Sequence, residues 1–465
     1  MKKTIVVYDD TRTPERMIRN ITGNKSFGDT IYKRVSLCDR TGKIVLKQQS
    51  CAAFLTREQA EDYTGPDAPV LKIYSDNVIG NEEAFRILAQ KTLYAKECYR
   101  VESESGVAAV VYPDLAAYAA STQDQEAAYA KIESDAFFSI ASADAFRRFI
   151  TSGFDARYFN ELTGDAYTVI KHSENVDKLR REYKFYGLLP EEMQMWFAKP
   201  FSYKEEGTRA SYTMERYHMT DLAIRYVHGA ITTEEFLEIM EKLFCFIASR
   251  KKKEVSAEMY RACARALYVD KVRERIKMLT EHPAYAKLDA LIAAGTKYAG
   301  IADLCEKYVA LYERLTEKKQ FENVLVIGHG DLCFSNILYS HEASFLKLID
   351  PKGADTEDEL YTNPYYDLAK LSHSVCGSYD YFNSDLFSVV VEESMELGVT
   401  VDCDNAEYIA IFRDYLQRYG LDYRLIRLYE ASLFLSMLPL HIDRERKVLG
   451  FICNAIAIME EVEHG

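Results

Sequence analysis

The stretch Val324-Leu-Val-Ile-Gly-His-Gly-Asp-Leu-Cys-Phe-Ser-Asn-Ile-Leu338 decides the fold of this chain. Its apolar start ends in a turn containing Gly328 and Gly330, and an apolar run resumes at Ile337. After a polar break, Phe345–Ile349 has the composition of a further strand. The pattern predicts a strand, a polar loop and two more strands, with polar side chains at the edges of the loops.

Three side chains of this region, Asp331, Asn336 and Asp350, have the chemistry for phosphoryl transfer from a nucleotide. The reaction needs a carboxylate beside the attacking hydroxyl and oxygen ligands that hold Mg²⁺ against the phosphates. Mg²⁺ usually takes only one or two carboxylates from the protein. We expect Asp331 to orient or deprotonate the acceptor hydroxyl, and Asn336 and Asp350 to hold the metal. Each residue alone could be a turn, cap or strand-end residue, but the ordered set favours function.

The motif H-G-D-L-C-F-S-N at 329–336, with I-D-P-K-G at 349–353, resembles the catalytic and metal loops of the aminoglycoside phosphotransferase and choline kinase family. The block N-P-Y-Y-D-L-A-K-L at 363–371 also resembles that family. The resemblance implies that Asp367 supports the catalytic loop, with His329 as a second supporting residue. It further implies a two-lobed, protein-kinase-like fold that uses ATP and Mg²⁺.

The chain departs from this family at two places. Cys333-Phe-Ser335 occupies the loop where His-Pro-Gly is frequent, and Pro351 follows the metal-binding Asp in place of Phe.

A strand and a helix upstream provide a lysine and a glutamate at a suitable spacing. Residues 166–171 form a predicted strand that ends on Lys171, and Ser173 or Asn175 could cap a helix after it. Glu182 on this helix resembles the kinase glutamate that fixes the strand lysine, which in turn reaches the α- and β-phosphates. The alternative is a solvated lysine and an ordinary helix glutamate; the downstream motif favours the ion pair.

The remaining nucleotide contacts are predicted less specifically. Residues 209–217 resemble the last strand and hinge between kinase lobes, with Met214 near the base and Glu215 to Tyr217 at the hinge. An ordinary edge strand would look the same. A hairpin between 152 and 164 must cover the phosphates, although it lacks the glycine-rich G-x-G-x-x-G pattern, so its ATP contacts stay unassigned.

The composition is that of a globular chain with more than one domain. It has 465 residues, 48% of them hydrophobic, and a net charge of −14. Such a charge disfavours binding to nucleic acid or to an anionic membrane. The ten cysteines include no C-x-x-C pair, and no apolar run is long enough to span a membrane. These features predict a cytoplasmic protein with reduced thiols.

The predicted fold class is α+β: a bilobal kinase-like fold with a mostly helical C-lobe, preceded by a small α/β domain. The predicted domains are the α/β domain over 1–120, a helical connector over 121–149, an N-lobe over 150–217 and a C-lobe over 218–465.

Some details within these domains are also predicted. In the first domain, Lys33–Val45 is predicted as two strands around the turn Asp39-Arg-Thr-Gly. The basic residues at 250–253 are predicted to be solvated, and His373 is interpreted as a satisfied structural histidine.

The role of the first domain is unknown. The pair Asp9-Asp10 lacks the Asp-x-Asp of a phosphatase loop. Kinases of this family are sometimes joined to a sugar nucleotidyltransferase domain, but the glycine-rich signature of those enzymes is missing. A truncated or non-catalytic relative of such a domain is the simplest interpretation.

The function that the resemblance implies is ATP- and Mg²⁺-dependent transfer of the γ-phosphate to a hydroxyl of a small soluble molecule. The acceptor would be a sugar, an amino alcohol or an aminoglycoside-like compound, in surface or capsular polysaccharide metabolism, bound between the catalytic loop and the helices after Tyr365. Protein kinase activity is one alternative, although Gly330 stands where those enzymes favour Arg. The other is an inactive nucleotide-binding scaffold. The oligomeric state is not predicted.

Overall fold

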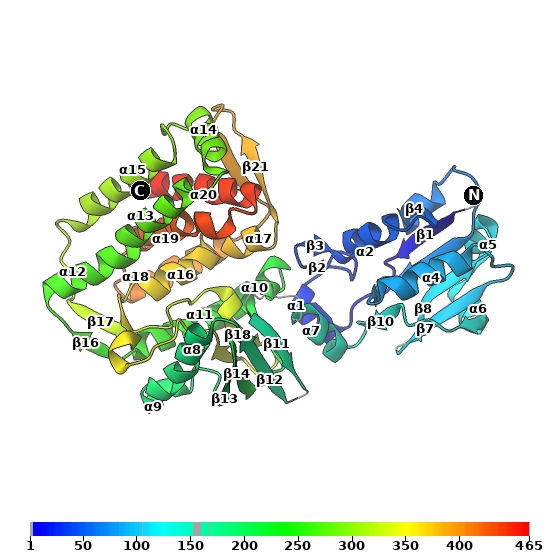
Figure 1. The fold of residues 1–465 in the computed structure, drawn as a ribbon, viewed down its shortest axis with the longest axis horizontal. Coiled ribbons are helices and arrows are strands. Elements are labelled where there is room, and N and C mark those ends of the chain that lie inside the picture. The colour runs from blue at the N-terminus through cyan, green and yellow to red at the C-terminus, as the bar shows by residue number, and fades with distance from the viewer. Residues whose placement is uncertain (1–2, 105, 152–159, 166, 465) are drawn as a thin grey trace. The chain divides into compact units, whose positions relative to one another are not determined.

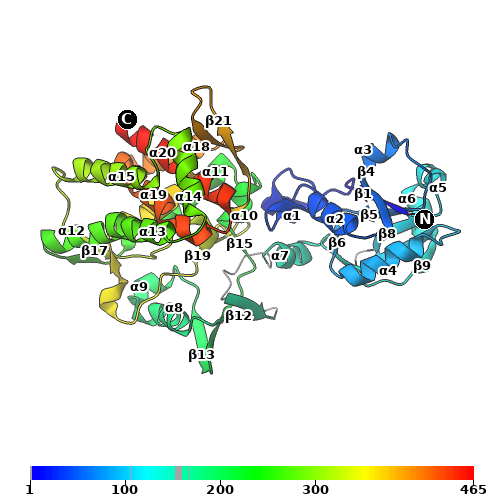
Figure 2. The same cartoon turned by 45° about the horizontal axis from the view of Figure 1, so that its top comes forward.

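The computed structural model describes residues 3–104, 106–151, 160–165 and 167–464. Contacts divide the chain into two compact units. Unit 1 comprises Met1–Asp155 with His228–Ala230, and unit 2 comprises Ala156–Val227 with Ile231–Gly465. Figures 1 and 2 show the elements of both units from two directions.

A six-stranded mixed sheet lies at the centre of unit 1, in the order β4-β1-β5-β8-β7-β9. The strands of unit 1 are β1 (Thr4–Asp9), β2 (Ile31–Tyr32), β3 (Val35–Ser36), β4 (Cys51–Thr56), β5 (Val70–Tyr74), β6 (Asn77–Ile79), β7 (Tyr99–Ser103), β8 (Gly106–Tyr112), β9 (Ala130–Ile132) and β10 (Phe137–Ser139). β1 is parallel to β4 and β5, whereas β8 is antiparallel to β5 and β7.

Helices cover both faces of this sheet. They are α1 (Arg16–Thr22), α2 (Leu37–Leu46), α3 (Arg57–Glu61), α4 (Glu82–Thr92), α5 (Leu115–Ala120), α6 (Gln123–Ala128) and α7 (Ala143–Thr151). On one face Val6 and Leu71 pack with Val45 of α2 and Leu88 of α4. On the other face, Val7 and its neighbours pack with residues of α3 and α5. Alternate residues of β1 therefore belong to two cores, as in an α/β domain, and the sheet extends beyond the predicted limit at residue 120 to include β9.

Two local predictions in unit 1 are wrong. Residues 121–149 are not a helical connector, because β9 pairs with β7 and β10 pairs with β6. Residues 37–46 form helix α2, where the turn at 39–42 and parts of the two strands beside it were predicted. Ser36 caps this helix by accepting a hydrogen bond from the Asp39 amide at 3.0 Å. The Phe54 ring packs so closely on this helix that position 42 has no room for a side chain. A Cβ on Gly42 would lie 2.9 Å from the ring.

Unit 2 begins with an N-lobe of four antiparallel strands in the order β11-β12-β14-β13. The elements are β11 (Asn160–Gly164), β12 (Thr168–Ser173), α8 (Val176–Leu188), α9 (Glu191–Gln194), β13 (Pro200–Glu206) and β14 (Arg209–Glu215). Asn175 caps α8 by accepting from the Lys178 amide at 3.0 Å, as predicted. Leu179 of α8 packs on Tyr212 of β14. Most of the predicted phosphate-covering hairpin, 152–164, lies outside the described residues.

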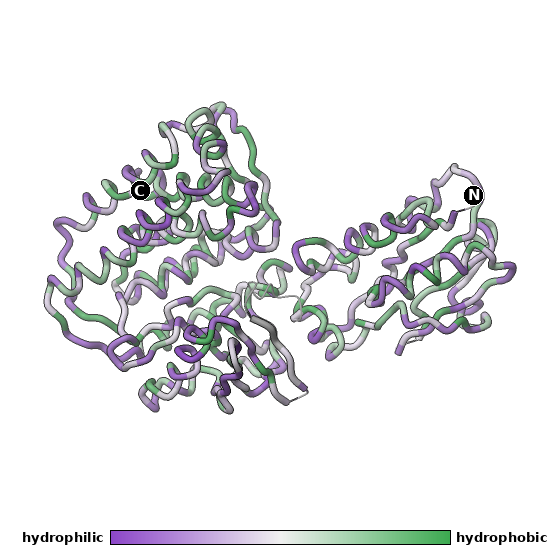
Figure 3. Tube along the Cα trace, viewed as in Figure 1, coloured by the Kyte–Doolittle hydropathy of each residue, from purple (hydrophilic) through white to green (hydrophobic). Residues whose placement is uncertain are grey.

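The C-lobe follows and is mostly helical. Its helices are α10 (Leu222–Val227), α11 (Thr233–Ser249), α12 (Ala257–Arg265), η1 (Ala266–Asp270), α13 (Lys271–Thr280), α14 (Tyr285–Gly295), α15 (Ile301–Thr316), η2 (Phe334–Asn336), η3 (Glu357–Leu360), α16 (Tyr366–Val375), α17 (Tyr379–Asn383), α18 (Ala406–Arg418), α19 (Tyr423–Met437), η4 (Leu438–His441) and α20 (Glu445–His464). Figure 3 shows hydrophilic and hydrophobic residues alternating along these helices, as expected for helices that pack against a shared core.

Short strands position the loops of the C-lobe. They are β15 (Thr220–Asp221), β16 (Lys252–Glu254), β17 (Val324–Ile327), β18 (Ile337–Ser340), β19 (Phe345–Leu348), β20 (Tyr361–Thr362), β21 (Phe387–Val391) and β22 (Leu397–Val401). The predicted fold class is confirmed: an α/β domain precedes a strand-rich lobe and a mostly helical lobe. Among the described residues, no helix is long and apolar enough to cross a membrane.

Candidate active site

The loop after β17 is shaped by His329. Its Nδ1 accepts a hydrogen bond from the Asp331 amide at 3.1 Å, and its Nε2 lies 2.8 Å from the Ile349 carbonyl oxygen. These contacts fit the tautomer with the proton on Nε2. The imidazole is fully buried and stacks on the Phe197 ring. His329 therefore connects the loop that carries Asp331 to the residue before Asp350.

Asp367, at the start of α16, holds the backbone of the same loop. One carboxylate oxygen accepts from the His329 amide at 3.0 Å, and the other accepts from the Gly330 amide at 2.8 Å. Gly330 has a φ of 81°, which favours glycine. The Arg250 guanidinium lies 3.2 Å from the same carboxylate. Asp367 is fully buried, so this cation compensates a charge that would otherwise be costly.

Arg250 is a residue that the sequence analysis missed. It was predicted to be solvated, yet it is only 6% exposed and also donates to the Pro364 carbonyl. Nothing in the neighbouring basic sequence distinguishes it, because its partner Asp367 lies far along the chain.

Asp331 uses its two carboxylate oxygens for different partners. Oδ1 lies 2.9 Å from the Lys370 ammonium, and Oδ2 accepts from the Asn336 side-chain amide at 3.2 Å. The Asn336 amide nitrogen also donates to the Asp331 carbonyl at 2.8 Å. Because these contacts occupy Nδ2, Oδ1 of Asn336 is the atom that remains for a ligand. The Asp331 side chain is 44% exposed, so an acceptor molecule can reach it.

Lys370 and Ser374 complete this side of the site, and neither was predicted. They follow Asp367 on α16 at spacings of three and seven residues, which places all three on one helix face. Ser374 accepts from the Phe334 amide at 3.0 Å. Burial lowers the pKa of Lys370, but the Asp331 carboxylate raises it above its usual range on balance. The shared spacing with Asp367 is the signal that could have found both residues.

On the N-lobe side, Lys171 of β12 joins two carboxylates. Its ammonium lies 2.7 Å from Glu182 of α8 and 2.9 Å from Asp350, which follows β19. Lys171 and Glu182 are buried, whereas the Asp350 side chain is 41% exposed. Burial alone would lower the pKa of Lys171, but Asp350 and Glu182 raise it well above its usual range. Burial raises the pKa of Asp350, and Lys171 more than offsets this, so the pKa is lowered.

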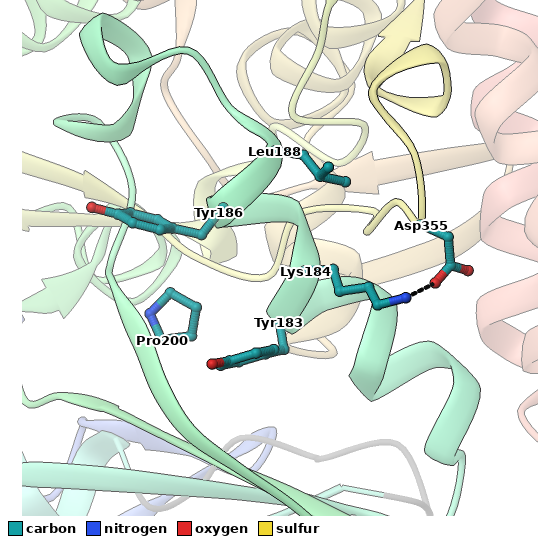
Figure 4. Close-up of a pocket in the computed structure, with 7 residues that line it drawn as sticks. Tyr183, Lys184, Tyr186, Leu188, Pro200 and Asp355 are labelled. Atoms are coloured by element: carbon teal, nitrogen blue, oxygen red, sulfur yellow. Dashed lines mark hydrogen bonds and ion pairs between the residues drawn. The ribbon is translucent and has the colours of Figure 1, made fainter.

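The segment after Asp350 packs directly on helix α8. The Ala354 amide donates to the Arg181 carbonyl at 3.0 Å, and Arg181 also binds Glu359 at 2.8 Å. Figure 4 shows a further ion pair, between Lys184 and Asp355, at 2.9 Å. The cavity in that view has a volume of about 470 Å³, and none of the predicted site residues lines it.

The predicted base and hinge residues lie at the junction of the lobes. Met214 lines a cavity of about 20 Å³ that Glu182 and Asp350 also line. Glu215 is the exposed last residue of β14. The ammonium of Lys347, a residue of β19, lies 5.7 Å from the centroid of the Tyr217 ring. Met214 is therefore close to the lysine and its partners, and the other two stand where the chain passes into the C-lobe.

His373 was predicted to be a structural histidine with hydrogen-bonded ring nitrogens, and this prediction is wrong. Its ring is fully buried between Tyr379 and Phe434, with centroid distances of 4.1 and 4.2 Å. Among the described residues, neither ring nitrogen has a hydrogen-bond partner. Burial and the nearby Lys370 lower the pKa of His373 well below its usual value, so the ring is neutral.

The donors of the site fit Mg²⁺. Asp350 supplies a partly exposed carboxylate, and Asn336 supplies an amide oxygen, both of which are hard oxygen ligands. Among the described residues, no group of three or more His, Cys, Asp or Glu side chains could hold a metal by itself.

Comparisons with known proteins give similarities in fold only. No family model and no curated protein matches the chain. Among solved structures, it is similar to a thermostable mutant of aminoglycoside phosphotransferase APH(4)-Ia in complex with ADP and hygromycin B, at 11% identity and a TM-score of 0.40, covering 69% of this chain and 99% of that one. It is also similar to a type VIII aminoglycoside-3'-phosphotransferase, at 14% identity and a TM-score of 0.34 over 60% of this chain and 93% of that one. A protein described as a fructosamine-3-kinase from Haemophilus somnus 129PT is similar at 10% identity and a TM-score of 0.39, over 66% of this chain and 91% of that one.

Proposed function

We propose that the chain transfers the γ-phosphate of ATP to a hydroxyl group of a small molecule in a Mg²⁺-dependent reaction. The observation that carries this proposal is the ammonium of Lys171, which contacts both Glu182 and Asp350. These residues come from a strand, a helix and a loop far apart in the sequence. A buried lysine held beside a partly exposed carboxylate is suited to binding phosphates next to a metal ion.

The proposal gives each side chain of the cluster a role. Lys171 would bind the α- and β-phosphates, with Glu182 keeping its ammonium in place. Asp350 and Oδ1 of Asn336 would hold Mg²⁺, which neutralises charge on the phosphates. Asp331 would orient the acceptor hydroxyl and accept its proton.

Other residues position these groups or contact the base. His329 and Asp367 hold the loop that carries Asp331. Met214 would lie near the base, with Glu215 and Tyr217 at the hinge.

The contacts of the segment after Asp350 favour a small-molecule acceptor over a peptide. This segment is bonded to α8 at Ala354, Asp355 and Glu359, the last of which lies in η3, and it then forms β20 before α16 begins at Tyr366. It therefore offers no free extended strand on which a peptide could lie. The acceptor would instead bind beside Asp331 and the start of α16. The resemblance implies a sugar or an amino alcohol of surface-polysaccharide metabolism; the amino alcohol is cationic at neutral pH, so the charges around Asp331 distinguish the two.

The two carboxylates can be separated by nucleotide binding. We expect ATP to bind the wild type more tightly with Mg²⁺ than without it. Asp350→Asn should remove this gain, because it removes a metal ligand. Asp331→Asn should keep the nucleotide affinity but lower phosphoryl transfer by about 10²–10⁴-fold, the usual contribution of a general base.

A matched control is Asp358→Asn, since Asp358 is 83% exposed and bonded to Lys253 at the surface. It should change neither ATP binding nor transfer. Equal, metal-independent loss in Asp331→Asn and Asp350→Asn would mean that the roles are divided wrongly. Absence of any Mg²⁺-dependent ATP binding by the wild type would overturn the proposed function.

A further inference from the structure

We propose that the acceptor of this chain is an alcohol that carries no positive charge, and that Lys370 excludes cationic acceptors from Asp331. This inference rests on the proposed function, because it concerns the molecule that Asp331 would activate. It begins with the two carboxylate oxygens of Asp331. Oδ2 faces Asn336 and so belongs to the metal side, which leaves Oδ1 for the acceptor side. Oδ1 is the oxygen that Lys370 contacts at 2.9 Å.

Lys370 is held in this position by its burial. Its side chain is 14% exposed, and the phenols of Tyr366 and Tyr379 are among the groups that act on its charge. Burial raises the pKa of Tyr379 to about 12, so this phenol is neutral and does not compete with Asp331. The carboxylate that an incoming ammonium group would need is therefore already neutralised by a cation that cannot easily leave.

The residues behind Lys370 add no free negative charge. His373, one turn along α16, has a pKa lowered by burial, Lys370, Arg427 and Lys447, so these cations face the same region. Burial raises the pKa of Asp380 to about 7, which leaves much of this carboxyl uncharged at neutral pH. Glu430 is already bonded to Arg427 and Ser372.

A cationic acceptor would consequently lose water without gaining a counter-charge. Placing a charge in a partly buried site is unfavourable unless a partner compensates it, and two cations close to one carboxylate repel each other. A neutral or anionic alcohol avoids this cost. Its hydroxyl can approach Oδ1 of Asp331 while Lys370 donates to another oxygen of the acceptor. The charge of the site thus selects the class of acceptor.

Binding of a polycationic alcohol tests the role of Lys370 directly. The probe is hygromycin B, an aminoglycoside, titrated calorimetrically into the full chain with Mg²⁺ and a non-hydrolysable ATP analogue. We expect no binding by the wild type at millimolar probe and at least tenfold tighter binding by Lys370→Met, because the charge of the Asp331 carboxylate is then no longer neutralised by Lys370. Lys370→Arg, which keeps the charge, should behave as the wild type. Lys271→Met is the matched control, since Lys271 donates to Tyr366 at 3.2 Å but has no contact with Asp331.

The outcomes are decisive in both directions. Gained binding in Lys370→Met alone supports the inference. Tight binding by the wild type, gained binding in Lys271→Met as well, or no gain in Lys370→Met overturns it. A parallel assay measures ATP turnover in the presence of each sugar. Glucose and glucuronate should each change the rate of turnover more than glucosamine does. Failure of the proposed function would show itself differently, as absence of Mg²⁺-dependent ATP binding in every protein tested.

Discussion

At the scale of single residues, Lys171 determines the geometry of the N-lobe side of the site. Lys171→Met removes the cation between Glu182 and Asp350 while keeping an unbranched side chain. It leaves the buried Glu182 without its nearest cation, because the Lys178 ammonium lies farther away, at 3.5 Å. Unpairing a buried charge typically costs about 3–5 kcal/mol. We therefore expect a lower free energy of unfolding and a large fall in kcat, measured by denaturant unfolding and ATP turnover.

Glu182→Gln is the milder partner of this variant, because a neutral amide oxygen can still accept from Lys171. It should reduce kcat less than Lys171→Met does. Equal effects on kcat and stability in the two variants would show that the ion pair has no part in placing the nucleotide.

The buried carboxyl of Asp380 should make stability depend on pH. Its pKa is about 7 in the folded chain and near 3.9 when unfolded, because burial disfavours the charged form. Between these values the folded state binds more protons, so its contribution to stability decreases as pH rises from about 4 to about 7. Asp380→Asn should remove this decrease. The gain relative to the wild type should grow with pH and reach on the order of 4 kcal/mol at pH 8.

Denaturant unfolding at several pH values between 4 and 8 measures this difference. A gain that is constant over this range would contradict the shifted pKa. Asp385→Asn, at a surface carboxylate bonded to Arg444 and Arg446, is the control and should show no comparable trend.

Sequence spacing was enough to find residues whose partners are near in the chain or belong to an ordered motif. Asp331, Asn336 and Asp350 were predicted in this way, and the structure brings the first two into contact and joins the third to Lys171. Lys370 and Arg250 were missed for one physical reason. Each is an ordinary basic residue of a helix or its end, and only folding brings it to its carboxylate partner.

At the scale of elements, helix α8 and the segment after Asp350 act as one unit because their backbones touch. A Cβ at Gly353, where φ is 80°, would meet the Arg181 carbonyl carbon and the Glu182 amide nitrogen, both at 2.8 Å. Gly353→Ala should push the segment away from α8 and so separate Asp350 from Lys171. We expect ATP turnover to fall at least tenfold.

Gly207→Ala provides the matched control for this variant. Gly207 also has a positive φ, 62°, but a Cβ there would meet nothing within 4 Å. Both variants carry the cost of a left-handed residue, about 1 kcal/mol, whereas only Gly353→Ala disturbs the site. Equal loss of turnover in the two, at equal loss of melting temperature, would contradict the coupling between α8 and this segment.

Elements with a local cap were predictable, and those decided by packing were not. Asn175 caps α8 in the structure as its position before the helix suggested. Helix α2 was mistaken for a strand because Gly42 resembles a turn residue, although close contact with Phe54 explains this glycine. The hairpin of β21 and β22 lies in a region predicted as helical, and its pairing is again a tertiary effect.

At the scale of the whole molecule, each unit has its own core and its own buried ion pairs. In unit 1, Lys72 lies 2.5 Å from Glu126, and both side chains are almost fully buried. Tyr74 and Tyr112 also donate to this carboxylate. Burial raises the pKa of Glu126, but Lys72 and the two phenols more than offset this effect. The pKa is therefore lowered on balance, and the carboxylate stays charged. All the site residues proposed for phosphoryl transfer lie in unit 2.

The two units should therefore respond separately to mutation. Lys72→Met leaves Glu126 buried without its cation, which should destabilise unit 1 by about 3–5 kcal/mol. Hydrogen exchange of the backbone amides in 3–151 should become faster, whereas exchange in 167–227 and 231–464 and Mg²⁺-dependent ATP binding should stay as in the wild type. Arg86→Met is the control, because the Arg86–Glu83 pair is exposed and such pairs contribute little to stability. Weaker Mg²⁺-dependent ATP binding in Lys72→Met, together with faster exchange in 3–151, would show that unit 1 supports the site. The separation of roles would then be wrong.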